Sequence, residues 1–295
     1  MSFDRIRKLA KEIAAYRRSR RWRRDRPRLR HLFGSARDGI VREAIRDWRG
    51  GYVPLAGGGW LYLPIGLDAQ ALRILIDGAE LDPAIALLCK PGDVAFDVGA
   101  NLGEWAVPLA RITGAGGAVF SFEPVAVLAD AVRRSLRING AVRAQVIEAA
   151  VADQAGKARM NVTMEKGGDG ALSSLTDAGG VEVDVVTIDG VVAERHIERL
   201  DLLKIDVEGA EPQVLAGAAG TIGRLKPKIV FESGHEGAEG RKRIAQLLKG
   251  AEYDLIGVLL DGVVAECDWA QYEADDGPFA DGRTRNLLAL PAEKK

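Results

Sequence analysis

The chain of 295 residues has few cysteines and no long apolar run. Cys89 and Cys267 stand alone, without the spacing of a metal site, which argues against a disulfide-stapled fold and favours a reducing compartment. No apolar stretch approaches the roughly 18 residues that cross a bilayer, and the charged N-terminus lacks the apolar core of a secretory signal. We therefore expect a globular protein of the cytoplasm, either free or peripheral to the membrane.

The first 30 residues are poor in acids, with 13 Lys and Arg against 3 Asp and Glu. The rest of the chain holds 28 basic and 39 acidic residues, so the net charge of -1 hides two oppositely charged parts. Residues 1–30 are typical of a basic helix. Such a helix contacts a membrane surface or a polyanion, or it packs on the body or on a second copy in a homo-oligomer. An Arg-rich transit peptide is a further alternative. Because the body is acidic, no specific nucleic acid is expected as a partner.

Three regions follow from the pattern of apolar residues. After the basic tail, residues 31–90 form an N-terminal extension, with helical segments at 36–49 and 68–88 and a hairpin at 51–64. Residues 91–295 alternate strands with helices, which predicts an α/β domain with a doubly wound, mostly parallel sheet. Its strands include a run from Ala144 to Val151, and a Gly-rich loop, GGDGALSSL, interrupts the domain as a lid candidate.

Residues 93–124 form the unit on which the functional hypothesis depends. An apolar run, Val94 to Val98, leads through a Gly-bearing turn into a helical pattern and a second apolar run, Ala118 to Phe122. This is a strand, turn, helix and strand, a unit that presents a helix N-terminus to a ligand. Glu123 ends the second strand, where an acid usually accepts hydrogen bonds from two ribose hydroxyls.

The turn itself distinguishes between nucleotide cofactors. A dinucleotide fingerprint is G-x-G-x-x-G, but this turn begins with Asp97 and has Asn101 at the middle glycine position. A carboxylate would repel a diphosphate, whereas it suits the positively charged methionine part of S-adenosylmethionine. The turn therefore favours S-adenosylmethionine over NAD. An NAD-dependent oxidoreductase and a non-catalytic nucleotide-binding protein tethered by its basic tail stay open as alternatives.

Six sequence pieces, in this order and separation, resemble the FkbM-type family of S-adenosylmethionine-dependent methyltransferases. They are FDVGANLG, SFEP, SSL, VDVVTID, DLLKIDVEGAEPQVLAGA and KPKIVFE, within roughly residues 90–260. The resemblance implies a Rossmann-like class I methyltransferase fold, with a seven-stranded sheet whose last strand is antiparallel. It also implies O-methylation of a hydroxyl on a sugar, a glycan or a small-molecule natural product.

The resemblance also implies roles for individual residues on the cofactor side. Glu123 would hold the ribose, Asp153 would meet the adenine amine, and Asp206 would contribute at the end of a later strand. The paired serines of the family correspond to Ser173 and Ser174, which would close over cofactor or substrate. The methionine-side loop would consist of Asp97, Gly99, Ala100, Asn101 and Gly103.

A second group of charged residues marks the acceptor side. Lys204 lies inside an apolar strand, where an unpaired ammonium is costly, so we expect a carboxylate partner, with Asp97 and Glu232 as candidates. Asp206 and Glu208 follow that strand at the carboxyl edge of the sheet, where open α/β sheets bind ligands. With Glu232, His235 and Lys204 they are the catalytic candidates, and Asp206, Glu208 or His235 would accept the proton of an acceptor hydroxyl. The two carboxylates also suit a divalent cation such as Mg²⁺, which stays undecided.

Overall fold

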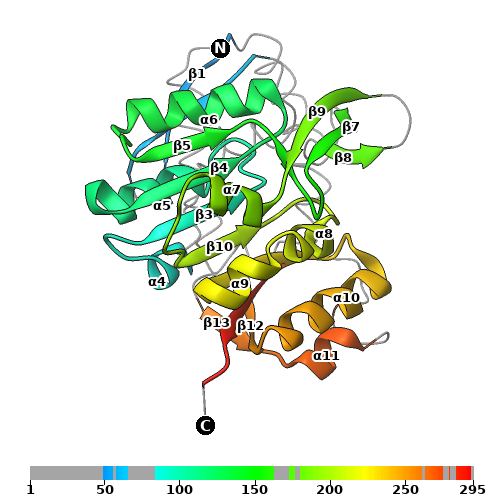
Figure 1. The fold of residues 1–295 in the computed structure, drawn as a ribbon. Helices are drawn as coiled ribbons and strands as arrows, with labels where there is room; N and C mark the ends of the chain where they lie inside the picture. Colours follow the sequence, from blue (N-terminus) through cyan, green and yellow to red (C-terminus); the bar gives the residue numbers. More distant parts are fainter. Residues whose placement is uncertain are drawn as a thin grey trace, which may run out of the picture.

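A sheet of eight strands lies at the centre of the part of the chain that the computed structural model describes, namely residues 49–55, 58–65, 84–162, 173–176, 180–260, 263–274, 279 and 284–293 (Figure 1). From one edge to the other, its strands are β5 (Ala144–Ile147), β4 (Ala118–Phe122), β3 (Val94–Val98), β10 (Leu202–Ile205), β11 (Lys228–Ser233), β14 (Arg285–Pro291), β12 (Tyr253–Leu260) and β13 (Val263–Glu266). The pairs from β5 to β11 are parallel, whereas β14 is antiparallel to β11 and to β12.

The expected seven strands are present, and the last of them, β14, is antiparallel as the resemblance implied. The structure adds an eighth strand, β13, which pairs antiparallel with β12 at the sheet edge. Because β3 pairs with β4 on one side and with β10 on the other, the strand order reverses between β3 and β10. Open α/β sheets bind ligands outside the carboxyl ends of the strands at such a switch point.

Helices cover both faces of this sheet, which confirms the doubly wound α/β arrangement. The helices are α4 (Ala84–Leu88), α5 (Ala106–Thr113), α6 (Ala126–Ile138), α7 (Ile188–Glu194), α8 (Glu211–Ala216), α9 (Ala219–Leu225), α10 (Gly237–Gly250) and α11 (Trp269–Glu273), with a 3-10 turn, η1, at Gly114–Gly116. Alternate residues along each strand serve the two faces: Phe96 and Leu203 pack with α7, α8 and α9, whereas Ala95 and Leu202 pack with α4 and α5.

A second sheet corrects the prediction for residues 144–151. That run was expected to be one strand, but it divides into β5 and β6 (Ala150–Val151), which belong to different sheets. The chain bends between them, where the Ala149 N–H donates to the Ile147 carbonyl and Glu148 turns outward to pair with Arg133. The small sheet has the order β6-β9-β7-β8, with β7 at Gly156–Val162, β8 at Ser173–Thr176 and β9 at Val181–Val186. Figure 1 shows β7, β8 and β9 projecting at the upper right.

The predicted hairpin of the N-terminal extension is present as β1 (Gly51–Pro54) and β2 (Trp60–Leu63). Leu61 and Leu63 are fully buried, in one apolar cluster with Val132 of α6. The Tyr62 N–H also donates to Ser135 Oγ of α6 at 2.8 Å. Residues 1–48, most of the predicted helix 68–88 and most of the Gly-rich loop lie outside the described residues. The domain boundaries predicted at residues 30 and 90 therefore stay predictions.

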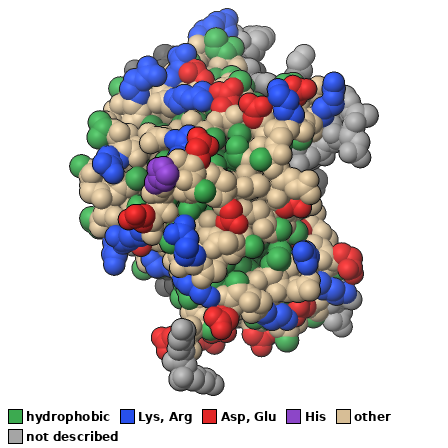
Figure 2. All heavy atoms as spheres, in the orientation of Figure 1, with side chains coloured by type: hydrophobic (Ala, Val, Ile, Leu, Met, Phe, Trp, Pro, Cys, Tyr) green, Lys and Arg blue, Asp and Glu red, His purple; other side chains and the backbone are tan. Residues whose placement is uncertain are grey.

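The helices of the described residues are too short or too polar to cross a membrane. Figure 2 shows basic and acidic side chains interspersed on the face that it presents. A cavity of about 310 Å³ opens at the amino ends of β4 and β5, where Arg111, Asn139 and Arg143 line it. It lies at the opposite end of the sheet from the acids predicted to bind ligand, which follow the carboxyl ends of the strands.

Candidate active site

The loop between β3 and α5 forms the first wall of the site. Gly99 and Ala100 both donate their N–H groups to the Phe122 carbonyl of β4, at 3.0 Å each. Gly99, Asn101 and Gly103 all have positive φ angles, of 78°, 49° and 93°. Gly99 tolerates no side chain, because an added Cβ would run into the main-chain oxygen of Asp206. The turn is therefore held close against β10, and the glycine is required by that contact.

Glu123 lies at the tip of β4, beside this loop, and is only 5% exposed. Its Oε2 accepts a hydrogen bond from the Asn101 N–H and its Oε1 accepts one from the Val125 N–H, both at 2.9 Å. A carboxylate has room for about four hydrogen bonds, so both oxygens retain acceptor capacity. Burial raises the pKa of Glu123 from 4.5 to about 7, although the two N–H donors lower it.

Lys204 and Asp97 form a buried ion pair between β10 and β3. Lys204 is 2% exposed and Asp97 is 0% exposed, and Lys204 Nζ lies 3.2 Å from Asp97 Oδ1. Lys204 Nζ also donates to the Gly99 carbonyl at 3.0 Å and lies 3.5 Å from Asp206 Oδ2. Burial works to lower the pKa of Lys204, but the charges of Asp97 and Asp206 raise it above its ordinary value. Lys204 is thus a cation that ties the cofactor loop to the end of β10.

Of the two partners predicted for Lys204, the structure confirms Asp97 and not Glu232. Asp97 is its partner, whereas Glu232 lies two residues past the position on β11 that faces Lys204 and approaches His235 instead. Because Asp97 is buried in the sheet and paired, its main role in the structure is to compensate Lys204. A direct contact of Asp97 with the methionine part of a cofactor stays a prediction.

Four residues at the carboxyl ends of β10 and β11 form what we call the acceptor cluster: Asp206, Glu208, Glu232 and His235. His235 Nε2 lies 2.8 Å from Glu208 Oε2 and 3.8 Å from Glu232 Oε2. Glu208 has a positive φ of 55°, and the following Gly209 packs against the His235 main chain. The sequence predicted the four residues at this edge, and the structure brings them together.

Burial and mutual repulsion shift the pKa values of this cluster upward. Burial raises the pKa of Glu232 to about 8, and the neighbouring charges of Asp206 and Glu208 add to the effect. Burial also raises the pKa of Glu208, although His235 opposes that change. The Oε2 atoms of Glu208 and Glu232 are buried and accept no hydrogen bond within the described residues. At neutral pH Glu232 therefore keeps a proton, which a positively charged ligand beside it would displace.

Comparison with known proteins identifies the family. The model of the methyltransferase FkbM domain matches residues 97–255. The chain is 32% identical over 222 residues to the 31-O-demethyl-FK506 methyltransferase FkbM of Streptomyces tacrolimicus, a match that covers 64% of this chain and 83% of that protein. This chain belongs to the FkbM-type methyltransferases. The resemblance inferred from its six sequence pieces is thereby confirmed.

More distant matches include the methyltransferase sdnD of Sordaria araneosa, 26% identical over 54% of this chain and 73% of that protein. Among solved structures, the methyltransferase FkbM of Methylobacillus flagellatus KT is 17% identical, with a TM-score of 0.46, over 88% of this chain and 60% of that one. The family is one of S-adenosylmethionine-dependent methyltransferases, so S-adenosylmethionine is the cofactor that the residues of the site have to fit. The alternatives of an oxidoreductase and of a non-catalytic binding protein receive no support.

The residues present fit the cofactor of the FkbM-type family. Glu123 offers carboxylate oxygens with free acceptor capacity at a strand tip, beside the loop that Gly99 and Gly103 allow to turn tightly. The excess of buried acid in the adjacent cluster suits a ligand with a positively charged sulfonium and ammonium group.

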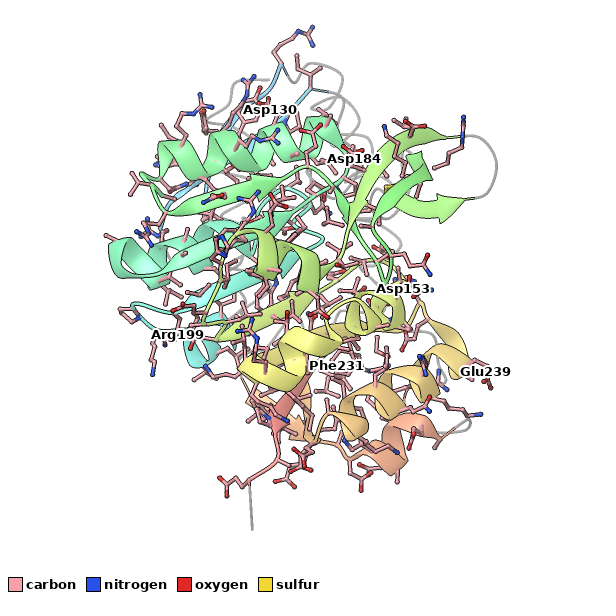
Figure 3. The ribbon with its side chains drawn as sticks, in the orientation of Figure 1. Asp130, Asp153, Asp184, Arg199, Phe231 and Glu239 are labelled. Atoms are coloured by element: carbon pink, nitrogen blue, oxygen red, sulfur yellow. The ribbon has the colours of Figure 1, made fainter. Side chains whose placement is uncertain are left out.

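Two predicted contacts lie further from these residues. Asp153 is exposed just after β6, and its main chain packs against Gly217 at the end of α8; Figure 3 shows it between the small sheet and that helix. Ser173 and Ser174 pair in β8 with Val162 and Asn161 of β7, and their side chains lie outside the described ones. Roles for Asp153 and Ser174 in cofactor binding stay predictions.

Two supporting acids were not predicted from the sequence. Glu211 is almost fully buried at the start of α8, where its Oε1 accepts hydrogen bonds from the Val207 and Gly209 N–H groups at 3.0 and 3.2 Å. Glu236 accepts hydrogen bonds from Ser233 Oγ, from the Gly234 N–H at 2.6 Å and from the Tyr272 hydroxyl at 3.0 Å.

These two acids hold the loops that carry Glu208 and His235. The available signal for Glu211 was its place before Pro212, at the first turn of a helix, where acids stabilise orphan N–H groups. Tyr272, which bonds Glu236, lies beyond the residues that the family model matches.

Proposed function

We propose that the chain transfers the methyl group of S-adenosylmethionine to a hydroxyl oxygen of a sugar, a glycan or a small-molecule natural product. One observation supports the proposal most: Gly99, in the loop expected to bind the cofactor, lies against the main chain of Asp206, in the cluster expected to bind the acceptor. The relative in Streptomyces tacrolimicus is named as a methyltransferase that acts on an oxygen, which supports the same class of acceptor.

On the cofactor side, Glu123 accepts hydrogen bonds from the two ribose hydroxyls and Asp153 receives the adenine amine. The loop from Asp97 to Gly103 encloses the methionine part. The cofactor supplies an activated methyl group with a neutral leaving group, so the main task of the protein is to position the acceptor for in-line displacement. Lys204, which contacts both the Gly99 carbonyl and Asp206, fixes the position of the loop relative to the end of β10 during this step.

On the acceptor side, the hydroxyl loses its proton as its oxygen bonds to the methyl carbon. Asp206 is placed to accept this proton, since it is the cluster residue next to the cofactor loop and its side chain is 33% exposed. If the cluster binds no cation, His235 is a second proton acceptor, with Glu208 2.8 Å away to stabilise its charge.

Calorimetric titration with S-adenosylhomocysteine tests the cofactor assignment. We expect Glu123→Ala to weaken binding at least tenfold, because the ribose hydroxyls lose their acceptor. Glu239→Ala is a matched control, since Glu239 lies exposed on α10 (Figure 3) and pairs only at the surface with Lys242. An unchanged affinity in the folded Glu123 variant would refute the ribose assignment.

The remaining proposals concern where the enzyme acts. We place it in the cytoplasm, with residues 1–30 as a contact to a membrane surface or a polyanion. This contact is proposed from the sequence alone, because these residues lie outside the described ones. Sedimentation with anionic vesicles, comparing the full chain with one that lacks residues 1–30, tests it.

A further inference from the structure

We propose that Glu208, Glu232 and His235 bind a first-row divalent cation, with Mn²⁺ as its best representative. Each of the three residues offers one ligand atom, and these atoms lie within 4.8 Å of one another. Cation binding as such requires no methyl donor. The use of the bound ion in catalysis, by contrast, rests on the function proposed above.

The distances within the group match those of a shared ion. An ion held at about 2.1 Å separates two ligand atoms by about 3.0 Å when they are at right angles and by about 4.2 Å when they are opposite. His235 Nε2 lies 2.8 Å from Glu208 Oε2 and 3.8 Å from Glu232 Oε2, inside or close to this interval. We expect small side-chain rotations to bring all three atoms onto one centre.

Two of the three ligand atoms lack a hydrogen-bond donor within the described residues. Glu208 Oε2 and Glu232 Oε2 are buried atoms without a hydrogen-bond donor among the described residues. The close approach of His235 to Glu208 lacks hydrogen-bond geometry, since Glu208 Oε2 is among these unpartnered atoms. Buried acceptors without a donor are costly, and a cation between them compensates both carboxylates.

The surrounding residues hold the ligands in place before any ion binds. Glu211 fixes the loop of Glu208 through the Val207 and Gly209 N–H groups. Glu236, bonded to the Tyr272 hydroxyl at 3.0 Å, fixes the loop of His235. Supporting hydrogen bonds of this kind orient metal ligands in proteins and contribute to affinity.

The donor set decides between metals. Mg²⁺ prefers oxygen ligands in a strict octahedron, whereas an imidazole with two carboxylates suits ions that accept both nitrogen and oxygen. Three protein ligands leave positions open for water or for substrate oxygens. We therefore expect Mn²⁺ to bind more tightly than Mg²⁺, and the acceptor hydroxyl to occupy an open position.

This assignment changes the roles within the acceptor cluster. A hydroxyl bound to a divalent cation loses its proton more readily. Asp206, which is not one of the three ligands, then receives that proton, and His235 acts as a ligand and not as the base. Cation binding and methyl transfer can be tested by separate experiments, because cation binding requires no methyl donor.

Titration of the chelator-treated full chain with Mn²⁺, followed by calorimetry and by the electron paramagnetic resonance of free Mn²⁺, tests the proposal. We expect one saturable site, weakened at least tenfold in Glu232→Gln and in His235→Ala. The variant Glu239→Gln, which changes an exposed acid on α10, is expected to bind Mn²⁺ as the parent chain does. Competition with Mg²⁺ is expected to require a large excess.

S-adenosylhomocysteine binding is measured in the same samples, with thermal denaturation to confirm that each variant is folded. Absence of saturable Mn²⁺ binding, or equal Mn²⁺ affinity in the parent chain and both variants, would overturn the cation site. If S-adenosylhomocysteine binds in such samples, the proposed function survives that result. Conversely, Mn²⁺ binding without S-adenosylhomocysteine binding refutes the function and leaves the cation site standing.

Discussion

The two halves of the site are built in different ways. On the cofactor side, most contacts are hydrogen bonds of the backbone. Glu123 accepts hydrogen bonds from two backbone N–H groups, and the β3–α5 loop donates two to the Phe122 carbonyl. On the acceptor side, side chains from two strands meet, and buried carboxylate oxygens lack donors within the described residues. In the cofactor half the buried carboxylate of Asp97 is compensated by Lys204, whereas the buried carboxyl groups of the acceptor half are available to a cationic ligand.

The largest effect is expected where the two halves join, at Lys204. Lys204→Met leaves Asp97 charged and unpaired at 0% exposure. Removing one partner of a buried pair costs about 3–5 kcal/mol of unfolding free energy, which urea denaturation measures. We expect the double variant with Asp97→Asn to recover much of this loss, since no buried charge then remains unpaired. Equal losses in the single and double variants would show that the pair does not hold the halves together.

A smaller effect is expected at Gly99, where the loop of the cofactor half lies against the Asp206 main chain. Gly99→Ala places a Cβ against the Asp206 main chain at a positive φ of 78°. Strain and overpacking together cost about 2–4 kcal/mol. Gly92 is a matched control, because its φ of 88° is similar but an added Cβ meets nothing within 4 Å.

Comparison of the two glycine variants separates backbone strain from contact. Gly92→Ala should cost only about 1–2 kcal/mol and leave S-adenosylhomocysteine affinity unchanged. Gly99→Ala should in addition weaken that affinity in calorimetry, because the loop is pushed away from β10. The same loss of stability in both variants would mean that the contact with Asp206 contributes nothing.

The contrast between the halves also explains which features could be predicted from the sequence. The strands Val94–Val98 and Ala118–Phe122 have the predicted limits, because a strand followed by a glycine turn and a helix leaves a local pattern. Glu123 was placed correctly at its strand tip for the same reason. Lys204 could be assigned a carboxylate partner because a buried ammonium requires one, and Asp97 provides it.

The contacts between residues of the acceptor half depend on geometry that no local pattern encodes, although the residues themselves were predicted. Glu208 reaches His235 through a left-handed backbone conformation, which is uncommon for a residue with a long side chain. The division of residues 144–151 between two sheets follows from a bend at Glu148, inside a mostly apolar run. The eighth strand had a signal in the Asp261-Gly262 pair, which favours a hairpin between the flanking apolar runs.

The smallest effect is a pH dependence that belongs to Glu123. Burial raises its pKa from 4.5 to about 7, so between these values the folded protein holds a proton that the unfolded chain has released. Its contribution to stability is therefore complete below pH 4.5 and is lost as the pH rises through 7. Glu123→Gln should flatten this part of the stability curve, whereas Glu239→Gln should not.

Cofactor affinity should change in the opposite direction, because the ribose hydroxyls donate to the ionised carboxylate. We expect S-adenosylhomocysteine affinity to rise by up to about tenfold per pH unit below the pKa of Glu123 and to level off above it. Titrations from pH 5.5 upward measure this, in the parent chain and in Glu123→Gln. A flat profile in the parent chain would mean that the cofactor half binds the ribose without using the charge of Glu123.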